Sequence, residues 1–352
     1  MTKIKFAGPF SLRMKSFLAL NRIALCAYGN HLAGRRMEPG GDVNLEIGIR
    51  FTRHQFTQAL LAASIAKGRL ILDSLQTETS DRYDIETTRI STPRGTWYMP
   101  RKPSSTATIL YCHGGGYSFH AAMSVRFAAM LAHHIGAPVF APDYRLTPEH
   151  PHPAQAEDAL EAWRYLAEKT PPKKIVVIGD SAGGHMMLTL LQNLRIHGTE
   201  QPALGIGLCP WTDIGARGDS LHGNDDCDLV QGWMALQFGQ WLDPEGRFGR
   251  AALSPINHNH AGNAPLYLQA GGWEILHDMI RQFAEKQVEF GADILLDVWP
   301  AMPHDFQLMD STQTAATAAL CRISAAVSAA VDQGPPLAPI AQTVVKGGMF
   351  AA

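Results

Sequence analysis

The sequence predicts an α/β fold with a mostly parallel sheet of eight strands and helices on both faces. Three observations lead to this prediction. Apolar runs rich in β-branched residues alternate with helix-like segments from residue 107 onward. One stretch, Lys173–Leu194, joins a strand to a helix through a very tight turn. The chain has 352 residues, 46% of them hydrophobic, which is enough for one large core with a smaller attached part.

Charge and cysteine content exclude several classes of protein. The chain has 30 Lys and Arg against 32 Asp and Glu, a net charge of −2, so nothing favours nucleic-acid binding. Its five cysteines are scattered and form no C-x-x-C pair, which is typical of free thiols in a reducing compartment. The pairs His133-His134 and His258/His260 have no carboxylate or cysteine partners at ligand spacing. We expect a cytoplasmic protein without a metal or a cofactor.

Residues 1–80 are expected to be helical and irregular. Cations precede the apolar run Phe17–Leu25, which imitates a signal peptide, but Asn21 and Arg22 interrupt the run and no small-residue cleavage site follows. No stretch is expected to reach the roughly 18–20 apolar residues that span a bilayer, so we expect no stable membrane insertion. The pattern favours an amphipathic helix that lies on a membrane or over the mouth of a site.

From residue 83 the elements follow one another regularly. Two short runs, 83–90 and 95–99, predict a hairpin. The six strands predicted after it are Ala107–Cys112, Pro138–Asp143, Lys174–Gly179, Leu204–Cys209, Pro265–Ala270 and Asp293–Trp299. The helices predicted between them are Met123–Ile135, Ala154–Glu168, Ala182–Ile196, Leu276–Phe290 and Thr312–Val331.

Two segments depart from this alternation. Residues 212–252 contain a helical pattern and are too long for a plain crossover, so we interpret them as an insertion. Residues 333–352 are rich in Pro, Gly and Ala and are expected to form a flexible tail. The predicted division is therefore 1–80, 81–211, 212–252, 253–332 and 333–352.

The tight turn carries Gly179-Asp180-Ser181-Ala182-Gly183, a G-x-S-x-G pattern. A serine on a sharp strand-to-helix turn is pushed out above the sheet edge, and side chains two residues to either side would clash, which explains the glycines. The turn also aims the first N–H groups of the helix at any oxygen that develops negative charge nearby. A plain connection with an N-cap serine would share these five residues, so the rest of the chain decides between the two interpretations.

Three consecutive glycines, Gly114, Gly115 and Gly116, follow His113 at the end of the strand 107–112. Glycines leave their N–H groups uncovered, and this loop leaves the strand at the edge where parallel sheets place ligands. The amides of Gly115 and Gly116, with that of Ala182, are candidates for an oxyanion hole. Gly114 is a further candidate, or serves mainly the turn.

A serine hydroxyl needs a base, and the base needs a carboxylate that orients it. His304 lies just beyond the last predicted strand, in the sequence MPHDF. Glu274 follows the penultimate strand, in AGGWEILHD. Both loops lie at the edge of the sheet that carries the serine, so Ser181, Glu274 and His304 are the candidate catalytic residues.

In this order, the motifs resemble those of the hormone-sensitive-lipase-like branch of the α/β-hydrolases, the bacterial family IV carboxylesterases. HGGGY at 113–117, GDSAGG at 179–184, DYRLTPEHP at 143–151, PAQAEDA at 153–159 and PWTD at 210–213 all match, over roughly residues 80–320. The resemblance implies an α/β-hydrolase fold, Ser181 as nucleophile, Glu274 as acid and His304 as base. It further implies a cap built from the N-terminal segment and residues 212–252, and a homodimer as an expectation of the family.

Some positions leave alternatives open. Many members have Asp where this chain has Glu274, and Asp278 is an alternative acid. Asp305 stands where Gly usually follows the histidine, so its carboxylate either raises the pKa of the imidazole or faces water. Aromatic residues near the sheet edge either line the substrate pocket or belong to the core; they are Tyr117, Trp211 and Trp273.

The predicted function is a serine carboxylesterase that hydrolyses short- to medium-chain esters of small molecules. A lactonase or a deacetylase of a specialised metabolite would use the same groups. A binding protein resembling the plant gibberellin receptor, or a lyase resembling the plant hydroxyisoflavanone dehydratases, would reuse the fold. That receptor lacks the catalytic histidine, whereas His304 is present here. The serine and the glycine loop together favour hydrolysis.

Overall fold

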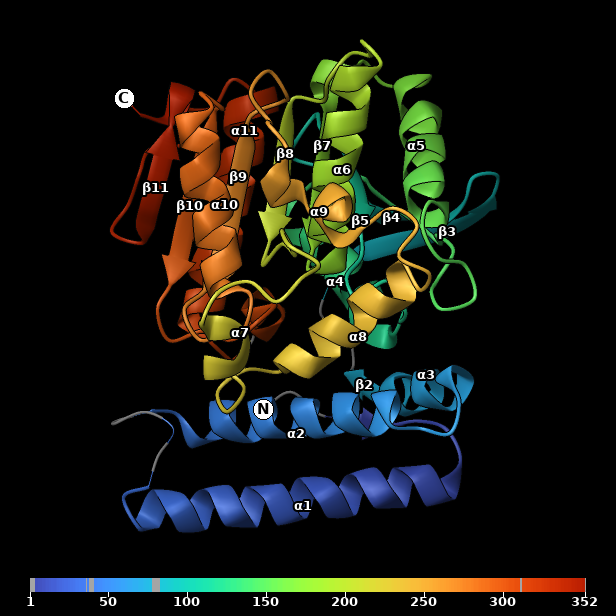
Figure 1. Ribbon diagram of the computed structural model, residues 1–352, viewed down its shortest axis with the longest axis vertical. Coiled ribbons are helices and arrows are strands. Elements are labelled where there is room, and N and C mark those ends of the chain that lie inside the picture. Colours follow the sequence, from blue (N-terminus) through green and yellow to red (C-terminus); the bar gives the residue numbers. More distant parts are fainter. Residues whose placement is uncertain (1–3, 36, 38–40, 78–82, 311, 352) are drawn as a thin grey trace.

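A nine-stranded sheet forms the centre of the protein, in the order β11-β10-β9-β8-β7-β5-β6-β4-β3 (Figure 1). The computed structural model describes residues 4–35, 37, 41–77, 83–310 and 312–351. Strands β5 to β10 pair in parallel, and antiparallel strands flank them at both edges. This confirms the predicted mostly parallel sheet, which has one strand more than the eight predicted. The strands are β3 (Ile85–Ser91), β4 (Arg94–Pro100), β5 (Thr108–Cys112), β6 (Val139–Pro142), β7 (Ile175–Asp180), β8 (Leu204–Leu208), β9 (Leu266–Gly271), β10 (Ile294–Trp299) and β11 (Thr343–Gly347).

The central strands bury both faces because consecutive residues point into different helical layers. In β7, Ile175 and Val177 pack with α5, α6 and α10, whereas Val176 and Ile178 pack with α4 and α11. The helices of these layers are α4 (Ala122–Ile135), α5 (Ala154–Ala167), α6 (Ala182–Ile196), α10 (His277–Glu289) and α11 (Thr314–Val331). Short 3₁₀ helices are η1 (Pro172–Lys174), η2 (Pro255–Asn257), η3 (Phe306–Met309) and η4 (Gly348–Phe350).

The C-terminal segment is ordered where a flexible tail was predicted. Strand β11 pairs antiparallel with β10 and forms one edge of the sheet, and Phe350 behind it is buried. Exposed and half-buried residues alternate along β11, as expected for an edge strand with one face toward the protein. The prediction was wrong for residues 343–350 because the many Gly, Pro and Ala residues of the tail obscure the strand pattern of the short run TVVKG.

Helix α11 has the length and mean hydropathy that would suffice to cross a membrane, contrary to the expectation that no stretch does. In the fold it packs against the sheet and α4, with Leu320, Ile323 and Val327 buried. This packing is that of a core helix.

A group of helices covers one end of the sheet (Figure 1). It consists of an N-terminal part and of the segment 212–252 that the sequence marks as an insertion. Helix α1 is outermost, and α2 lies between α1 and the rest of the protein (Figure 1). Strands β1 and β2 form a separate two-stranded ribbon. The short helix α9 (Arg250–Leu253) lies outside this group, beside α6 (Figure 1). The elements of the group are β1 (Ile4–Phe6), α1 (Phe10–Leu32), α2 (Val43–Leu60), α3 (Ile65–Asp73), β2 (Leu75–Thr77), α7 (Ser220–Gly223) and α8 (Gly232–Leu242). We call these helices and the ribbon the cap.

Candidate active site

Ser181 occupies the turn between β7 and α6. Its φ of 52° and ψ of −118° are a strained conformation for a residue other than glycine. A Cβ at Gly179 would overlap the carbonyl oxygen of Gly183, and a Cβ at Gly183 would overlap that of Cys112. The turn is therefore as crowded as the glycine pattern predicts, and Ser181 lines a cavity at the end of the sheet.

Two of the three loop glycines line the same cavity as Ser181. Gly115 and Gly116 have φ values of 102° and 60°, which favour glycine. Within the described part of the chain, their N–H groups and that of Ala182 donate to no acceptor. These three donors are available to an oxygen that becomes negatively charged.

The amide of Gly114 has another partner. It donates to Oδ1 of Asp180 at 2.8 Å, and the same oxygen accepts from the Tyr111 hydroxyl at 2.7 Å. Burial raises the pKa of Asp180 to about 6, although these two hydrogen bonds oppose the rise. The prediction of Gly114 as an oxyanion donor is therefore wrong: its N–H fastens the glycine loop to the serine turn.

His304 and Glu274 meet from the loops that follow β10 and β9. Nδ1 of His304 lies 2.8 Å from Oε2 of Glu274, whose Oε1 accepts from the Gly271 amide at 2.9 Å. Glu274 is fully buried. Because Glu274 occupies Nδ1, Nε2 is the nitrogen of His304 that remains for proton exchange.

Ser181 and His304 line the same cavity, but among the described residues no hydrogen bond joins them. Nε2 of His304 lies instead 3.5 Å from Oδ2 of Asp305. The structure thus brings Ser181, His304 and Glu274 to one site, but Ser181 and His304 are not hydrogen-bonded to each other there. Such contacts are often long before substrate binds.

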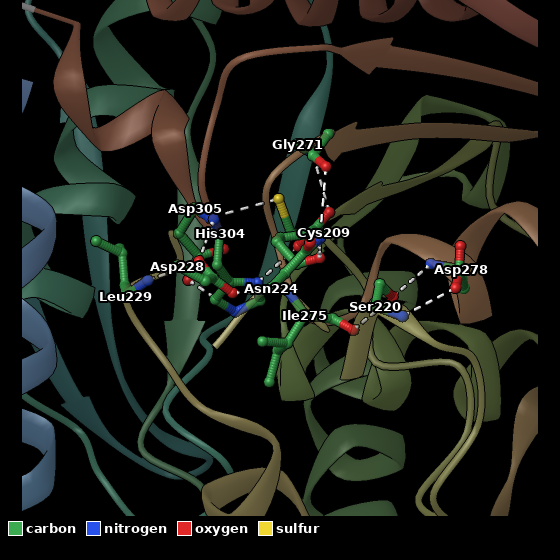
Figure 2. A network of polar contacts seen from close by, with 12 residues as sticks. Cys209, Ser220, Asn224, Asp228, Leu229, Gly271, Ile275, Asp278, His304 and Asp305 are labelled. Atoms are coloured by element: carbon green, nitrogen blue, oxygen red, sulfur yellow. Dashed lines mark hydrogen bonds and ion pairs between the residues drawn. The ribbon is translucent and has the colours of Figure 1, made fainter. Parts of the chain in front are cut away.

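Asp278, the alternative acid, is bound elsewhere (Figure 2). Its Oδ2 accepts from the amide of Ser220 at 2.9 Å, and its own amide donates to the Ser220 hydroxyl at 3.0 Å. Asp278 therefore fixes α7 of the cap against the start of α10.

Asp228, a fully buried residue of the insertion, holds together the two loops that carry Glu274 and His304 (Figure 2). Its Oδ1 accepts from the amides of His304 at 2.8 Å and Leu229 at 2.7 Å, and its Oδ2 accepts from the amide of Ile275 at 2.8 Å. Sequence reasoning missed this residue. In NDDCDLV it is one of several acidic residues of a loop, and no motif marks it.

Replacement of Asp228 by Asn is expected to lower kcat by about ten- to a hundredfold, because an NH₂ group must face one of three backbone donors and displaces a catalytic loop. Asp226→Asn is the matched control, since the Asp226 side chain is fully exposed in the same loop. Steady-state kinetics beside thermal melting would check this. An unchanged kcat in a folded Asp228→Asn protein would contradict the positioning role.

Asp305 places a second carboxylate beside His304. Its φ is 49°, and its Oδ1 is buried without a partner among the described residues. Burial alone lowers the pKa of His304, but the carboxylates of Asp305, Glu274 and Asp228 outweigh burial and raise this pKa to about 10. Of the two alternatives for Asp305, the geometry favours the one in which it raises the imidazole pKa.

Removal of this charge by Asp305→Asn is expected to move the acid limb of kcat/KM to lower pH, by about one to three pH units. Only a neutral imidazole takes a proton, so activity rises as pH passes through the pKa of His304. Losing a neighbouring carboxylate lowers that pKa. Asn also tolerates the positive φ. The check is a pH profile of wild type, Asp305→Asn and the control Asp226→Asn; an unmoved limb, or one moved to higher pH, would contradict it.

The cavity at the site has a volume of about 50 Å³, and its walls are mainly apolar. Phe56 of α2 and Phe238 of α8 line it from the cap, and Trp211 lines it from the core. The other two aromatic candidates are not among the residues that line this cavity. Tyr117 is buried with its hydroxyl 2.6 Å from Nδ1 of His185, and Trp273 lines a separate cavity.

Among the described residues, one cluster brings three metal-ligating groups together: atoms of Cys209, His304 and Asp305 lie within 4.8 Å of one another. Burial, and then the charges of Glu274 and Asp305, raise the pKa of the Cys209 thiol well above its usual value. Zinc binds the thiolate form of cysteine, and the raised pKa disfavours that form. The cluster is therefore a poor zinc site.

Comparison with known proteins shows that this chain is similar to esterases. Residues 109–308 match a family described as alpha/beta hydrolase fold. An acetyl-hydrolase of Streptomyces hygroscopicus is 34% identical over 217 residues, which are 59% of this chain and 70% of the relative. An esterase of Acinetobacter venetianus is 27% identical over 77% of this chain and 95% of its own length. The crystal structure of an esterase of the bacterial hormone-sensitive lipase family is 29% identical, covering 80% of this chain and 97% of the other, with a TM-score of 0.71.

Proposed function

The chain belongs to the family with the alpha/beta hydrolase fold and is a carboxylic-ester hydrolase, and we propose that it works through a triad of Ser181, His304 and Glu274. One observation carries this proposal: His304 Nδ1 lies 2.8 Å from Glu274 Oε2, beside a cavity that Ser181 also lines. This arrangement supplies the base that a serine hydroxyl needs and the carboxylate that holds the base in the correct tautomer.

In the first half of the reaction, Nε2 of His304 takes the proton of Ser181 while Oγ bonds to the ester carbonyl carbon. The carbonyl oxygen becomes an anion and accepts hydrogen bonds from the amides of Gly115, Gly116 and Ala182, each worth about 3–4 kcal/mol in the transition state. His304 then gives its proton to the alcohol oxygen as the carbon–oxygen bond breaks.

In the second half, a water molecule takes the place of the alcohol. His304 removes a proton from the water, whose oxygen attacks the acyl-enzyme through the same oxyanion. The bond to Ser181 Oγ breaks, Oγ regains the proton, and the carboxylic acid leaves. The carboxylate of Glu274 accepts a hydrogen bond from Nδ1 of His304 and stabilises the imidazolium in both halves.

Short acyl chains fit this site best. The cavity has a volume of only about 50 Å³, and the bulky side chains of Phe56 and Phe238 line it, which favours short chains over long ones. The similarity to an acetyl-hydrolase supports the same choice.

A p-nitrophenyl ester series from acetyl to palmitoyl, with Ser181→Ala beside it, tests the proposal. We expect fast turnover of the shortest chains, a fall with length and no turnover by the variant. Phe238→Ala is expected to shift the preference toward longer chains because it enlarges the cavity. Rates that do not depend on Ser181 would overturn the triad, and equal rates for all lengths would overturn the short-chain preference.

Removal of an acetyl group from a larger alcohol is a second candidate, favoured by the acetyl-hydrolase relative. It uses the same steps and differs only in the leaving group. Slow turnover of p-nitrophenyl acetate, together with rapid acetate release from an acetylated natural product, would favour it.

A further inference from the structure

Helix α1 presents a row of large apolar side chains to solvent. Leu25 is 75% exposed and Leu32 is 89% exposed, values that are unusual for leucine in a folded protein. Most of these residues are spaced three, four or seven positions apart, so they share one face of the helix. This outer face of α1 consists of Phe10, Met14, Phe17, Leu18, Leu25, Tyr28 and Leu32, each of which is at least 41% exposed.

The opposite side of α1 is fixed to the cap. Ser16 and Ala27 are its buried residues, and Gln55 of α2 donates to the Ser16 hydroxyl at 3.1 Å. Helix α1 is the outermost element at its end of the molecule (Figure 1). The outer face therefore points away from the protein along the whole helix, a length of about 35 Å.

The charge on α1 has one sign. Arg13, Lys15 and Arg22 are exposed on the helix, Arg35 is exposed just after it, and residues 1–37 contain no Asp or Glu. On a helical projection Lys15 and Arg22 lie on one flank of the outer face and Arg13 on the other. Cations that flank an exposed apolar face are the pattern of a helix that lies in a membrane interface.

We propose that the outer face of α1 binds the surface of an anionic lipid bilayer. The apolar side chains enter the boundary between headgroups and acyl chains, and the cations contact lipid phosphates. The helix lies along the surface and does not cross the bilayer, because its apolar residues form one face only.

The charge on α1 favours a lipid surface over a second copy of the chain as the partner of the outer face. In a symmetric contact between two outer faces, cations would meet cations, and α1 has no carboxylate to compensate them. An anionic surface matches both the apolar and the cationic part of the helix.

The bound orientation would place the cap toward the lipid. Helix α2, which packs on α1, also carries Phe56 in the wall of the cavity that Ser181 lines. A surface-bound protein would thus hold its cavity near esters dissolved in the membrane. The binding itself does not depend on the proposed triad.

Co-sedimentation with vesicles tests the proposal, using phosphatidylcholine alone or mixed with phosphatidylglycerol. We expect wild type and Ser181→Ala to bind the anionic vesicles equally and to bind phosphatidylcholine at least tenfold more weakly. Leu18→Glu/Leu25→Glu is expected to abolish binding. Arg13→Gln/Lys15→Gln/Arg22→Gln is expected to weaken it by about a hundredfold, from roughly fivefold per charge. Ile196→Glu, at an apolar residue of α6 that is also exposed, is the matched control and should bind as wild type.

The replaced residues of α1 and Ile196 are exposed, so these variants, unlike Ser181→Ala, should keep both the melting temperature and the turnover of a soluble ester. Equal binding to neutral and anionic vesicles would overturn the anionic assignment. A wild-type protein that binds neither, and is a dimer by light scattering that Leu18→Glu/Leu25→Glu converts to a monomer, would overturn the proposal and make the outer face an interface between two copies.

Discussion

Replacement of Ser181 by Ala is expected to lower kcat for p-nitrophenyl acetate by about a million-fold, the loss typical of a missing serine nucleophile. Without Oγ no acyl-enzyme forms, so the amides of Gly115 and Gly116 and the bound water can supply only a small residual rate. The free energy of unfolding should change by no more than about 1 kcal/mol, because Oγ makes no hydrogen bond within the described part of the protein.

Two measurements separate chemistry from folding in this experiment. Thermal melting should give the same midpoint for Ser181→Ala and wild type. Mass spectrometry of wild type, quenched during turnover of p-nitrophenyl butyrate, should find the butyryl group on the peptide that contains Ser181. Activity near wild type in the variant, or acylation of another residue, would contradict the assignment of the nucleophile.

Replacement of Glu274 by Gln is expected to lower kcat by about ten-thousandfold, by analogy with the Asp-to-Asn change in a serine-protease triad. Glu274 is fully buried and uses one oxygen for the Gly271 amide and the other for His304 Nδ1. An amide NH₂ in the second position would face Nδ1, favour the wrong tautomer and stabilise no imidazolium. The size of this loss depends on the protonation of His304, so it is best measured across a full pH range.

Asp278→Asn is the matched control for Glu274→Gln. Asp278 binds the amide of Ser220, so its replacement should cost about 1 kcal/mol of stability and change kcat less than tenfold. Kinetics of both variants with the same ester would decide. A greater loss of kcat in Asp278→Asn than in Glu274→Gln would mean that the acid of the triad is wrongly assigned.

The elements of the sheet were predictable because each carries a local signal. The run KKIVVIGDSAGG contains a strand, a crowded turn and the start of a helix within twelve residues, so its geometry follows from its own sequence. Strand β11 has a weaker signal, because only half of an edge strand faces the protein and its neighbours are Gly, Pro and Ala. Its pairing with β10 depends on a partner almost fifty residues away in the chain.

For the candidate site, too, some features follow from local sequence and others only from the tertiary structure. By itself the sequence determined the candidates Ser181, His304 and Glu274, since motifs and strand ends mark their positions. Only the tertiary structure decided how Gly114 bonds, where Tyr117 and Trp273 point, and that Asp228 links two loops 47 and 76 residues further along the chain. The physical reason is that motif chemistry is set by neighbours in sequence, whereas a hydrogen-bond partner or a pocket wall is set by packing between segments that the fold brings together.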